Sequence, residues 1–246
     1  MSFKGVSFSV TSQAAWAPGL ETKDAWLAWA QGDSAITGDR EPPVPAMAPM
    51  LRRRAGFLGK MALEVAYQCL GEQSDIPTVF CSRHGEVVRS VDLLLDLAKG
   101  EPLSPTSFGL SVHNATGGLF SIARRDHANA TALAAGKSSV EHAVIEACGL
   151  LAEGEPKVLL VVYDCPLPGL YAGFQDCEEQ PFAWAWLIEP PAQRNIALSW
   201  SRVPAAPANH DERLPGGLEV LRFFLREDPI LERICEGRRW VWACHV

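Results

Sequence analysis

The sequence predicts an α/β protein, with a mostly parallel sheet covered by helices on both faces and an antiparallel portion near the C-terminus. Short apolar runs rich in β-branched residues, at 78–82 and 158–162, are typical of buried strands. Segments with helical spacing of apolar residues separate these runs, and such alternation favours parallel strands joined by helices. The runs "FAWAWLIEP" and "IALSWSRV", with only "PAQRN" between them, predict an antiparallel hairpin.

Each expected element follows from its local pattern. "FKGVSFSVTS" alternates apolar and polar residues as a strand does, whereas the segment 51–70 gathers its apolar side chains on one helical face. Ser104 followed by Pro105 is a favourable helix start. A proline-rich loop is expected at about 40–50 and a Pro/Ala-rich loop before the last helix, within a single domain spanning 1–246. Strands are expected at 3–12, 78–82, 128–135, 156–164, 182–190, 196–203 and 238–246, and helices at 21–32, 51–70, 83–100, 137–153 and 216–228.

Composition and charge exclude several classes of protein. The net charge of −7 argues against a broad nucleic-acid-binding surface, which is normally basic. No apolar run approaches the roughly 20 residues that cross a bilayer, and no secretory signal is visible, so a cytoplasmic protein without a membrane span is expected. The cysteines lie mostly in apolar segments and lack C-x-x-C or zinc spacing, which predicts reduced core thiols, no metal and no cofactor. These cysteines are Cys69, Cys81, Cys148, Cys165, Cys177, Cys235 and Cys244.

The stretch "TALAAGKSSVEHA", residues 131–143, predicts a strand, a turn at Gly136 and the start of a helix. Enzymes often display a nucleophile at such a corner, because the first N–H groups of the helix stabilise negative charge. Ser138 and Ser139 are expected to cap the helix, and Lys137 is an activated amine only if it is desolvated. "AAGKSS" is not a phosphate-binding loop, because Thr131 stands where that motif has its first glycine.

Other polar residues offer weaker candidates for chemistry. A cysteine and a histidine three residues apart, Cys81 and His84, could act as a nucleophile and its base. A thiol at the end of an apolar strand, however, is more often a buried part of the core. A small acyltransferase or hydrolase that uses Cys81 or Ser138 is therefore kept as the alternative function. His113 and Asn114 lie next to glycines, where either a ligand contact or a helix junction fits.

Long segments of the chain resemble one known family. The runs "CSRHGEVVRSVDLLLDLAKGEPLSPTSFGLSVHN" and "EHAVIEACGLLAEGEPKVLLVVYD" are similar to the N-terminal half of β-ketoacyl synthases. Together with "WAPGLETKDAWLAWAQG" and "PPVPAMAPMLRRRAGFLGKMALEVA", they most resemble short β-ketoacyl synthase-like N-terminal domain proteins, in particular chain length factors of aryl polyene biosynthesis. The resemblance implies a thiolase-type fold, here a single half of the usual duplicated architecture.

The same resemblance implies that the corner is inactive. Active relatives carry a nucleophilic cysteine there, at a position that corresponds to Lys137 within one residue. Gly136, Lys137 and Ser138 include no thiol. Active synthases also take two histidines from a second half, which a chain of 246 residues does not hold. We therefore expect no catalytic residue in this chain.

The implied partners are a ketosynthase subunit and an acyl carrier protein whose phosphopantetheine holds the acyl chain. In the family the two subunits pair through the strand before the corner, which is "HANATALAA" here, and its small residues permit close approach of another backbone. The expected function is a non-catalytic chain length factor that helps shape the ketosynthase's acyl tunnel during elongation of polyene or fatty acyl chains. The candidates for the interface or tunnel are His113, Asn114, Phe120, Ala128, Asn129, Ala130, Thr131, Ala132 and Leu133.

The basic cluster of Arg52, Arg53 and Arg54 begins the expected helix at 51–70. Positive charge is mildly unfavourable at a helix N-terminus, which suggests a second role in contacting an acidic carrier protein, although a solvated helix end is the favoured interpretation. A homodimeric scaffold that binds a carrier protein through this cluster is a further alternative.

Overall fold

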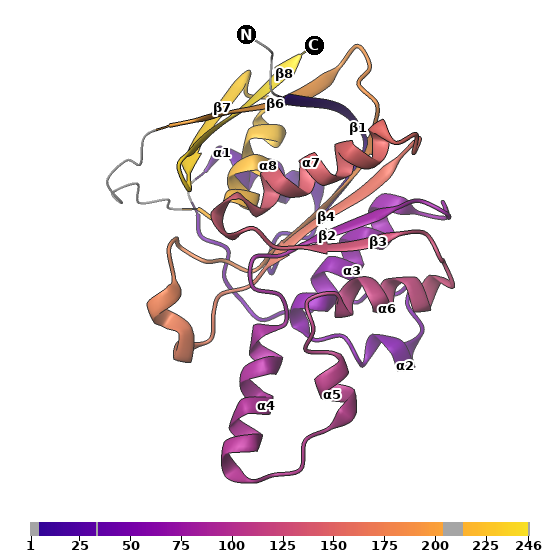
Figure 1. Ribbon diagram of the computed structural model, residues 1–246, viewed down its shortest axis with the longest axis vertical. Helices are drawn as coiled ribbons and strands as arrows, with labels where there is room; N and C mark the ends of the chain where they lie inside the picture. Colours follow the sequence, from indigo (N-terminus) through magenta and orange to yellow (C-terminus); the bar gives the residue numbers. More distant parts are fainter. Residues whose placement is uncertain (1–4, 33, 204–213, 246) are drawn as a thin grey trace.

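Eight strands form one sheet in the computed structural model, which describes residues 5–32, 34–203 and 214–245 (Figure 1). Their order across the sheet is β3-β2-β4-β5-β1-β6-β8-β7. β3 (Ala130–Leu133) and β4 (Val158–Asp164) run parallel to β2 (Thr78–Cys81), because helices connect these strands. Every other neighbouring pair is antiparallel. The α/β class is confirmed, but the expectation of a mostly parallel sheet is wrong.

The expected hairpin is also wrong, although both of its strands exist. β5 (Phe182–Glu189) and β6 (Asn195–Arg202) are not neighbours, because β1 (Gly5–Trp16) lies between them and pairs with each. A C-terminal hairpin is present, but β7 (Ile230–Cys235) and β8 (Arg238–His245) form it. No strand was expected at 230–235.

Helices cover both faces of the sheet, as expected. α3 (Phe57–Leu70) and α6 (Ala115–Arg124) pack on the face that carries Phe80, Leu159 and Ala185. On the other face lie α1 (Lys23–Gln31), α7 (Ser139–Ala152) and α8 (Gly216–Arg226), over Val79, Trp184 and Trp186. α4 (Val87–Lys99) and α5 (Pro105–Gly109) instead project away from the sheet as an arm (Figure 1).

Several boundaries differ from the expected ones for local reasons. The helix expected at 51–70 is broken into the short α2 (Pro49–Arg52) and α3, and Gly56 is the N-cap of α3. α4 begins four residues later than expected, after Gly85, whose φ of +58° is incompatible with a right-handed helix. The Pro/Ala-rich loop expected before α8 lies outside the described residues. Of the helices that the structure describes, none has the length and apolar character needed to cross a bilayer.

Candidate functional site at the end of strand β3

The corner predicted at 131–143 is present. β3 ends at Leu133, the one-turn 3₁₀ helix η1 (Gly136–Ser138) follows, and α7 begins at Ser139. Gly136 has a φ of +55°, and a Cβ atom there would lie 2.2 Å from the Glu236 Oε1 atom. The positive φ therefore favours glycine at this position, and a Cβ atom there would also force the Glu236 carboxylate to move.

The turn of the C-terminal hairpin covers this corner. Glu236 and Gly237 join β7 to β8 with positive φ angles of 51° and 72°, as in a two-residue type I′ turn. The Glu236 carboxylate accepts a hydrogen bond from the Lys137 backbone N–H, with 3.3 Å between nitrogen and Oε1. Its other oxygen accepts a hydrogen bond from the Ser138 hydroxyl. One carboxylate thus accepts hydrogen bonds from both the Lys137 N–H and the Ser138 hydroxyl.

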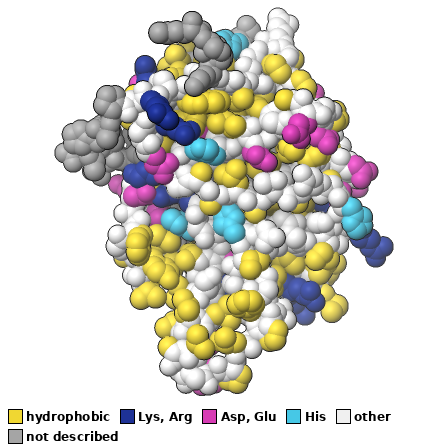
Figure 2. Space-filling view, in the orientation of Figure 1, with side chains coloured by type: hydrophobic (Ala, Val, Ile, Leu, Met, Phe, Trp, Pro, Cys, Tyr) yellow, Lys and Arg dark blue, Asp and Glu magenta, His cyan; other side chains and the backbone are white. Residues whose placement is uncertain are grey.

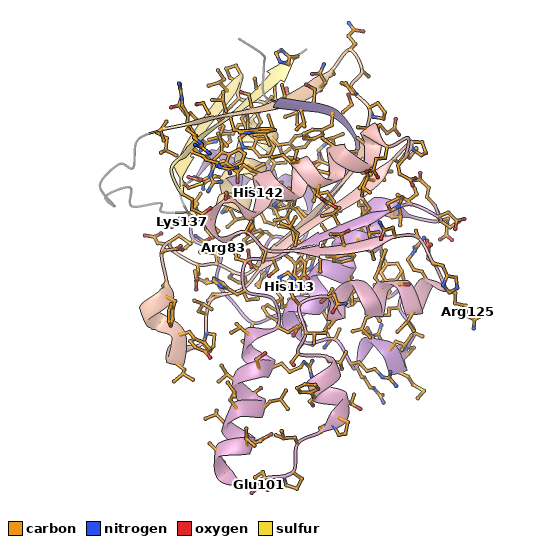
Figure 3. All side chains as sticks on the ribbon, in the orientation of Figure 1. Arg83, Glu101, His113, Arg125, Lys137 and His142 are labelled. Carbon is orange, nitrogen blue, oxygen red and sulfur yellow. The ribbon has the colours of Figure 1, made fainter. Side chains whose placement is uncertain are left out.

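The Lys137 side chain is ion-paired, neither fully solvated nor fully buried. Its side chain is 28% exposed, and Nζ lies 3.9 Å from the Asp176 carboxylate and 3.4 Å from the Asp176 carbonyl oxygen. Arg83, which follows β2, pairs with the same carboxylate at 2.5 Å. Figure 3 shows Lys137 and Arg83 near each other at the corner. Asp176 therefore links the corner to the end of β2.

The two serines do not cap α7 in the expected way. Ser138 is the N-cap residue, but its side chain makes no capping hydrogen bond; its hydroxyl donates to Glu236, and the Ala135 carbonyl oxygen is a longer alternative acceptor at 3.2 Å. The Ser139 hydroxyl donates to the Gly136 carbonyl at 2.8 Å and accepts from the Ala135 N–H at 2.9 Å. Both hydroxyls stabilise the turn that precedes the helix.

A buried ion pair fixes the hairpin to α7. Arg233 on β7 pairs through Nη1 with Glu141 of α7, and the side chains are 2% and 0% exposed. Its Nε atom pairs with Glu219 of α8, and its Nη2 donates to the Lys137 carbonyl at 3.3 Å. The Trp242 indole N–H of β8 also donates to Glu141, at 3.4 Å. The hairpin is therefore held over the corner by contacts with both α7 and α8.

The candidates for a nucleophile and base are not brought together. Cys81 is fully buried beneath α7, and burial, together with the charges of Asp164 and Glu141, raises the pKa of its thiol well above the usual value. His84 instead lies 3.3 Å from Glu179, and burial lowers its pKa. In the described part of the chain no imidazole hydrogen-bonds the Ser138 hydroxyl, and His142 Nδ1 faces the Ser138 carbonyl. A hydrolase based on Cys81 or Ser138 gains no support.

A buried carboxyl lies at the end of β4, beside the Arg83 loop. Asp164 accepts hydrogen bonds from the Ser82 hydroxyl at 2.8 Å and from the Arg83 N–H at 2.9 Å. Burial nevertheless raises the pKa of Asp164 to about 7. The ring of His113 closes the same loop, with Nε2 2.9 Å from the Ser82 carbonyl oxygen, so this nitrogen carries the proton. His113 therefore has a local structural role here.

The remaining interface candidates differ in accessibility. Phe120 is 4% exposed and packs edge-on against Tyr67 and Phe80, so its ring is core and is not available to a partner. Asn114 is the N-cap of α6 and makes no side-chain capping bond. β3 pairs with β2 on one side only and lies at the edge of the sheet. Its residues Ala130–Leu133 are half-buried or exposed, as are Ala128 and Asn129 before it.

The arm formed by α4 and α5 exposes large apolar side chains. Hydrophobic atoms gather over this part of the surface in Figure 2, and Figure 3 places Glu101 at its tip, far from the corner. Large exposed apolar patches are typical of surfaces that bind another molecule. The exposed apolar residues on and beside the arm are Val88, Leu94, Leu95, Leu97, Leu103, Phe108 and Val112.

The arginine cluster has mixed roles. Arg52 donates to the carbonyl oxygens of Pro43 and Val44, at 3.0 and 3.2 Å, and so fastens the proline-rich loop. Arg53 and Arg54 are exposed. Only these two are available to an acidic partner.

A cavity of about 680 Å³ opens at the base of the arm. Apolar residues such as Phe57 and Val88 line it together with Glu86, Arg89 and Glu179, and no corner residue does. The described residues contain no cluster of His, Cys, Asp and Glu able to hold a metal ion.

Sequence reasoning missed the residues that close the corner. Glu236, Arg233 and Asp176 lie 39 to 99 positions from their partners at Lys137 and Ser138. The two residues Glu236 and Gly237 between "ILERIC" and the strand expected at 238–246 are a hairpin signal that was available. No sequence signal indicated where this hairpin packs.

Solved structures define the class of fold. A chain of the complex of ketosynthase ApeO with its chain length factor ApeC, from Xenorhabdus doucetiae, superposes with a TM-score of 0.84 at 28% identity, covering 97% of this chain and 99% of that chain. The ishigamide ketosynthase/chain length factor gives 0.73 at 13% identity, over 98% and 99%. The AntDE:AntF complex, a type II polyketide synthase carrier protein with its ketosynthase, gives 0.70 at 10% identity, over 98% and 99%. The last two show the shared fold alone, which is the ketosynthase, or thiolase, type.

A family model described as β-ketoacyl synthase, N-terminal domain, matches residues 26–243, which is most of the chain. The chain therefore belongs to the β-ketoacyl synthase N-terminal domain family, and the resemblance found in the sequence is confirmed. A comparison with curated protein sequences finds no match.

Proposed function

We propose that this chain is a non-catalytic chain length factor, which pairs with a ketosynthase and helps shape its acyl tunnel during elongation of carrier-protein-bound aryl polyene or fatty acyl chains. The observation that carries the proposal is the corner. On a ketosynthase fold, Gly136, Lys137 and Ser138 offer no thiol, and Glu236 and Asp176 already bind the polar groups there.

The partner face that we propose combines the β3 edge with the α4–α5 arm. An edge strand presents unpaired backbone groups that another strand can use, and the arm adds the apolar area that a stable interface requires. The similarity at 28% identity to a chain of a ketosynthase–chain length factor complex, over nearly the full length of both, supports a ketosynthase as the occupant. Arg53 and Arg54 are the proposed contacts for an acidic acyl carrier protein.

Co-expression with a ketosynthase from the same gene neighbourhood tests this function. We expect a stable 1:1 complex, and we expect an acyl-thioester probe to label the ketosynthase but not this chain. Two proteins that are each soluble and never co-purify would refute the proposal. Labelling of this chain that is abolished by Ser138→Ala or Cys81→Ala would establish the acyltransferase alternative instead.

A further inference from the structure

We propose that the C-terminal hairpin is a built-in cover for the corner, with Glu236 as the carboxylate that occupies the place where an acyl carbonyl or another anion would bind. This inference rests on the proposed function, because it names the residue that keeps acyl groups of the complex away from the inactive subunit. It concerns contacts within this chain and does not require the partner.

The geometry of the turn is matched to this task. The Lys137 N–H and the Ser138 hydroxyl both point to the Glu236 carboxylate, one to each oxygen. Polar hydrogens at a helix start are the groups that hold an oxyanion or an anionic ligand in other folds. Here an internal carboxylate satisfies both of them, so an incoming carbonyl oxygen finds no free donor at this position.

The absence of a Cβ atom at residue 136 allows the carboxylate to come this close. Any side chain there would meet Glu236 Oε1 at 2.2 Å, and the positive φ of Gly136 aims its neighbour's N–H at the carboxylate. Glu236 itself adopts a positive φ of 51°, which is uncommon for a residue with a side chain. The two residues in this contact, Gly136 and Glu236, thus both have positive φ angles.

The hairpin cannot swing away freely, because its base is anchored in the core. Arg233, three residues before Glu236, is 2% exposed and bridges Glu141, Glu219 and the Lys137 carbonyl. The anchor contacts the same residue, Lys137, whose N–H the cover binds. Arg233 therefore binds the Lys137 carbonyl while Glu236 binds the Lys137 N–H, so the hairpin holds both backbone polar groups of this residue.

A thiol introduced at the corner is a direct probe of the cover. A carboxylate beside a thiol disfavours the thiolate and so raises the pKa of the thiol, whereas a helix start lowers it. The experiment compares Lys137→Cys with Lys137→Cys/Glu236→Gln in the full chain. The rate of iodoacetamide alkylation is followed against pH by mass spectrometry of the peptide that contains position 137.

We expect Glu236→Gln to make alkylation at position 137 about 10-fold faster at pH 7 and to lower the pH midpoint by about one unit. The matched control is Glu232→Gln on the same hairpin, since the Glu232 carboxylate pairs with Arg239 instead. This control should leave the alkylation profile of Lys137→Cys unchanged. Equal profiles for Lys137→Cys with and without Glu236→Gln would overturn the proposal.

Hydrogen exchange tests the same contact without a substitution at the corner. In Glu236→Ala we expect the Lys137 amide to exchange at least 5-fold faster than in the wild type, while the β7–β8 ladder is unchanged; equal exchange would also overturn the proposal. The outcome is separable from the proposed function. A chain that never pairs with a ketosynthase can still show both effects, and a chain that pairs can lack them.

Discussion

The corner and the arm differ in what their side chains contact: polar groups at the corner bind one another, whereas apolar side chains on the arm are exposed to solvent. At the corner, the Lys137 N–H, the Lys137 ammonium and the Ser138 hydroxyl all have partners within the chain, supplied by Glu236 and Asp176. On the arm, large apolar side chains such as Leu97 and Phe108 remain 60% and 64% exposed.

This difference indicates which part of the fold retains a task for another molecule. At the corner, which we propose as the inactive counterpart of a nucleophile position, this chain's own carboxylates bind the polar groups. On the arm, which we propose as part of the partner face, exposed apolar surface costs free energy in water unless it is covered. The predictions below first disturb the closed region and then the open one.

The largest effect is expected at the buried anchor of the hairpin. Arg233→Met keeps the length of the side chain but leaves Glu141, which is 0% exposed, without its guanidinium. Removing one member of a buried pair typically costs about 3–5 kcal/mol of the free energy of unfolding. Urea unfolding of the purified chain measures this loss.

Arg239→Met is the control for that experiment. It breaks an ion pair on the same hairpin, but its partner Glu232 is 41% exposed and water screens the pair, so the free energy of unfolding should change far less than in Arg233→Met. Similar losses for the two variants would mean that the corner is not held by the anchor, and the contrast with the arm would weaken.

The second prediction concerns pH. The folded-state pKa of Asp164, about 7, lies above the ordinary value of 3.8, so its stabilising contribution is full below about pH 4 and is lost as the pH rises to about 7. Asp164→Asn stays neutral and keeps one side-chain oxygen, which can accept from both Ser82 and Arg83 as Oδ1 does in Asp164. Relative to the wild type, its free energy of unfolding should increase by about 2–4 kcal/mol between pH 4 and pH 8.

The measurement is urea unfolding of both proteins at several pH values. Asp92→Asn, at an exposed position on α4, serves as the control and should track the wild type at every pH. A difference between Asp164→Asn and the wild type that does not change with pH would refute the assigned role of the buried carboxyl.

The fold was predictable where the pattern was local. The uninterrupted run at 158–162, the helix expected at 137–153 and the turn at Gly136 before it were identified, because strand and helix periodicities are properties of consecutive residues. The position of β1 between β5 and β6 was not, since strand order depends on contacts between segments far apart in the chain. A five-residue connection suggested a hairpin, and the N-terminal strand occupied the space instead.

For the candidate site, the sequence predicted the position of the turn but not the residues that pack against it. The sequence located the turn at Gly136, and the missing thiol followed from the resemblance, but Glu236 and Arg233 approach from about 100 residues away. The apolar stripe of α4 posed a different problem. Its spacing is that of a helix face packed on a core, and periodicity does not distinguish a core from the surface of another subunit.

Charged substitutions on the arm should have the smallest effect on the stability of the chain alone. They also test the proposed partner face directly. Leu97→Asp and Phe108→Asp alter exposed positions, so the free energy of unfolding of the chain alone should change by less than about 0.5 kcal/mol. Affinity for the ketosynthase, measured by titration calorimetry, should fall about 10- to 100-fold because a buried charge would replace an apolar contact. Ile230→Asp is the matched control, at a residue that is 62% exposed on β7, the edge of the sheet opposite β3. If Ile230→Asp weakens binding as much as the arm variants do, or if the arm variants bind normally, the partner face lies elsewhere and the exposed apolar arm has another role.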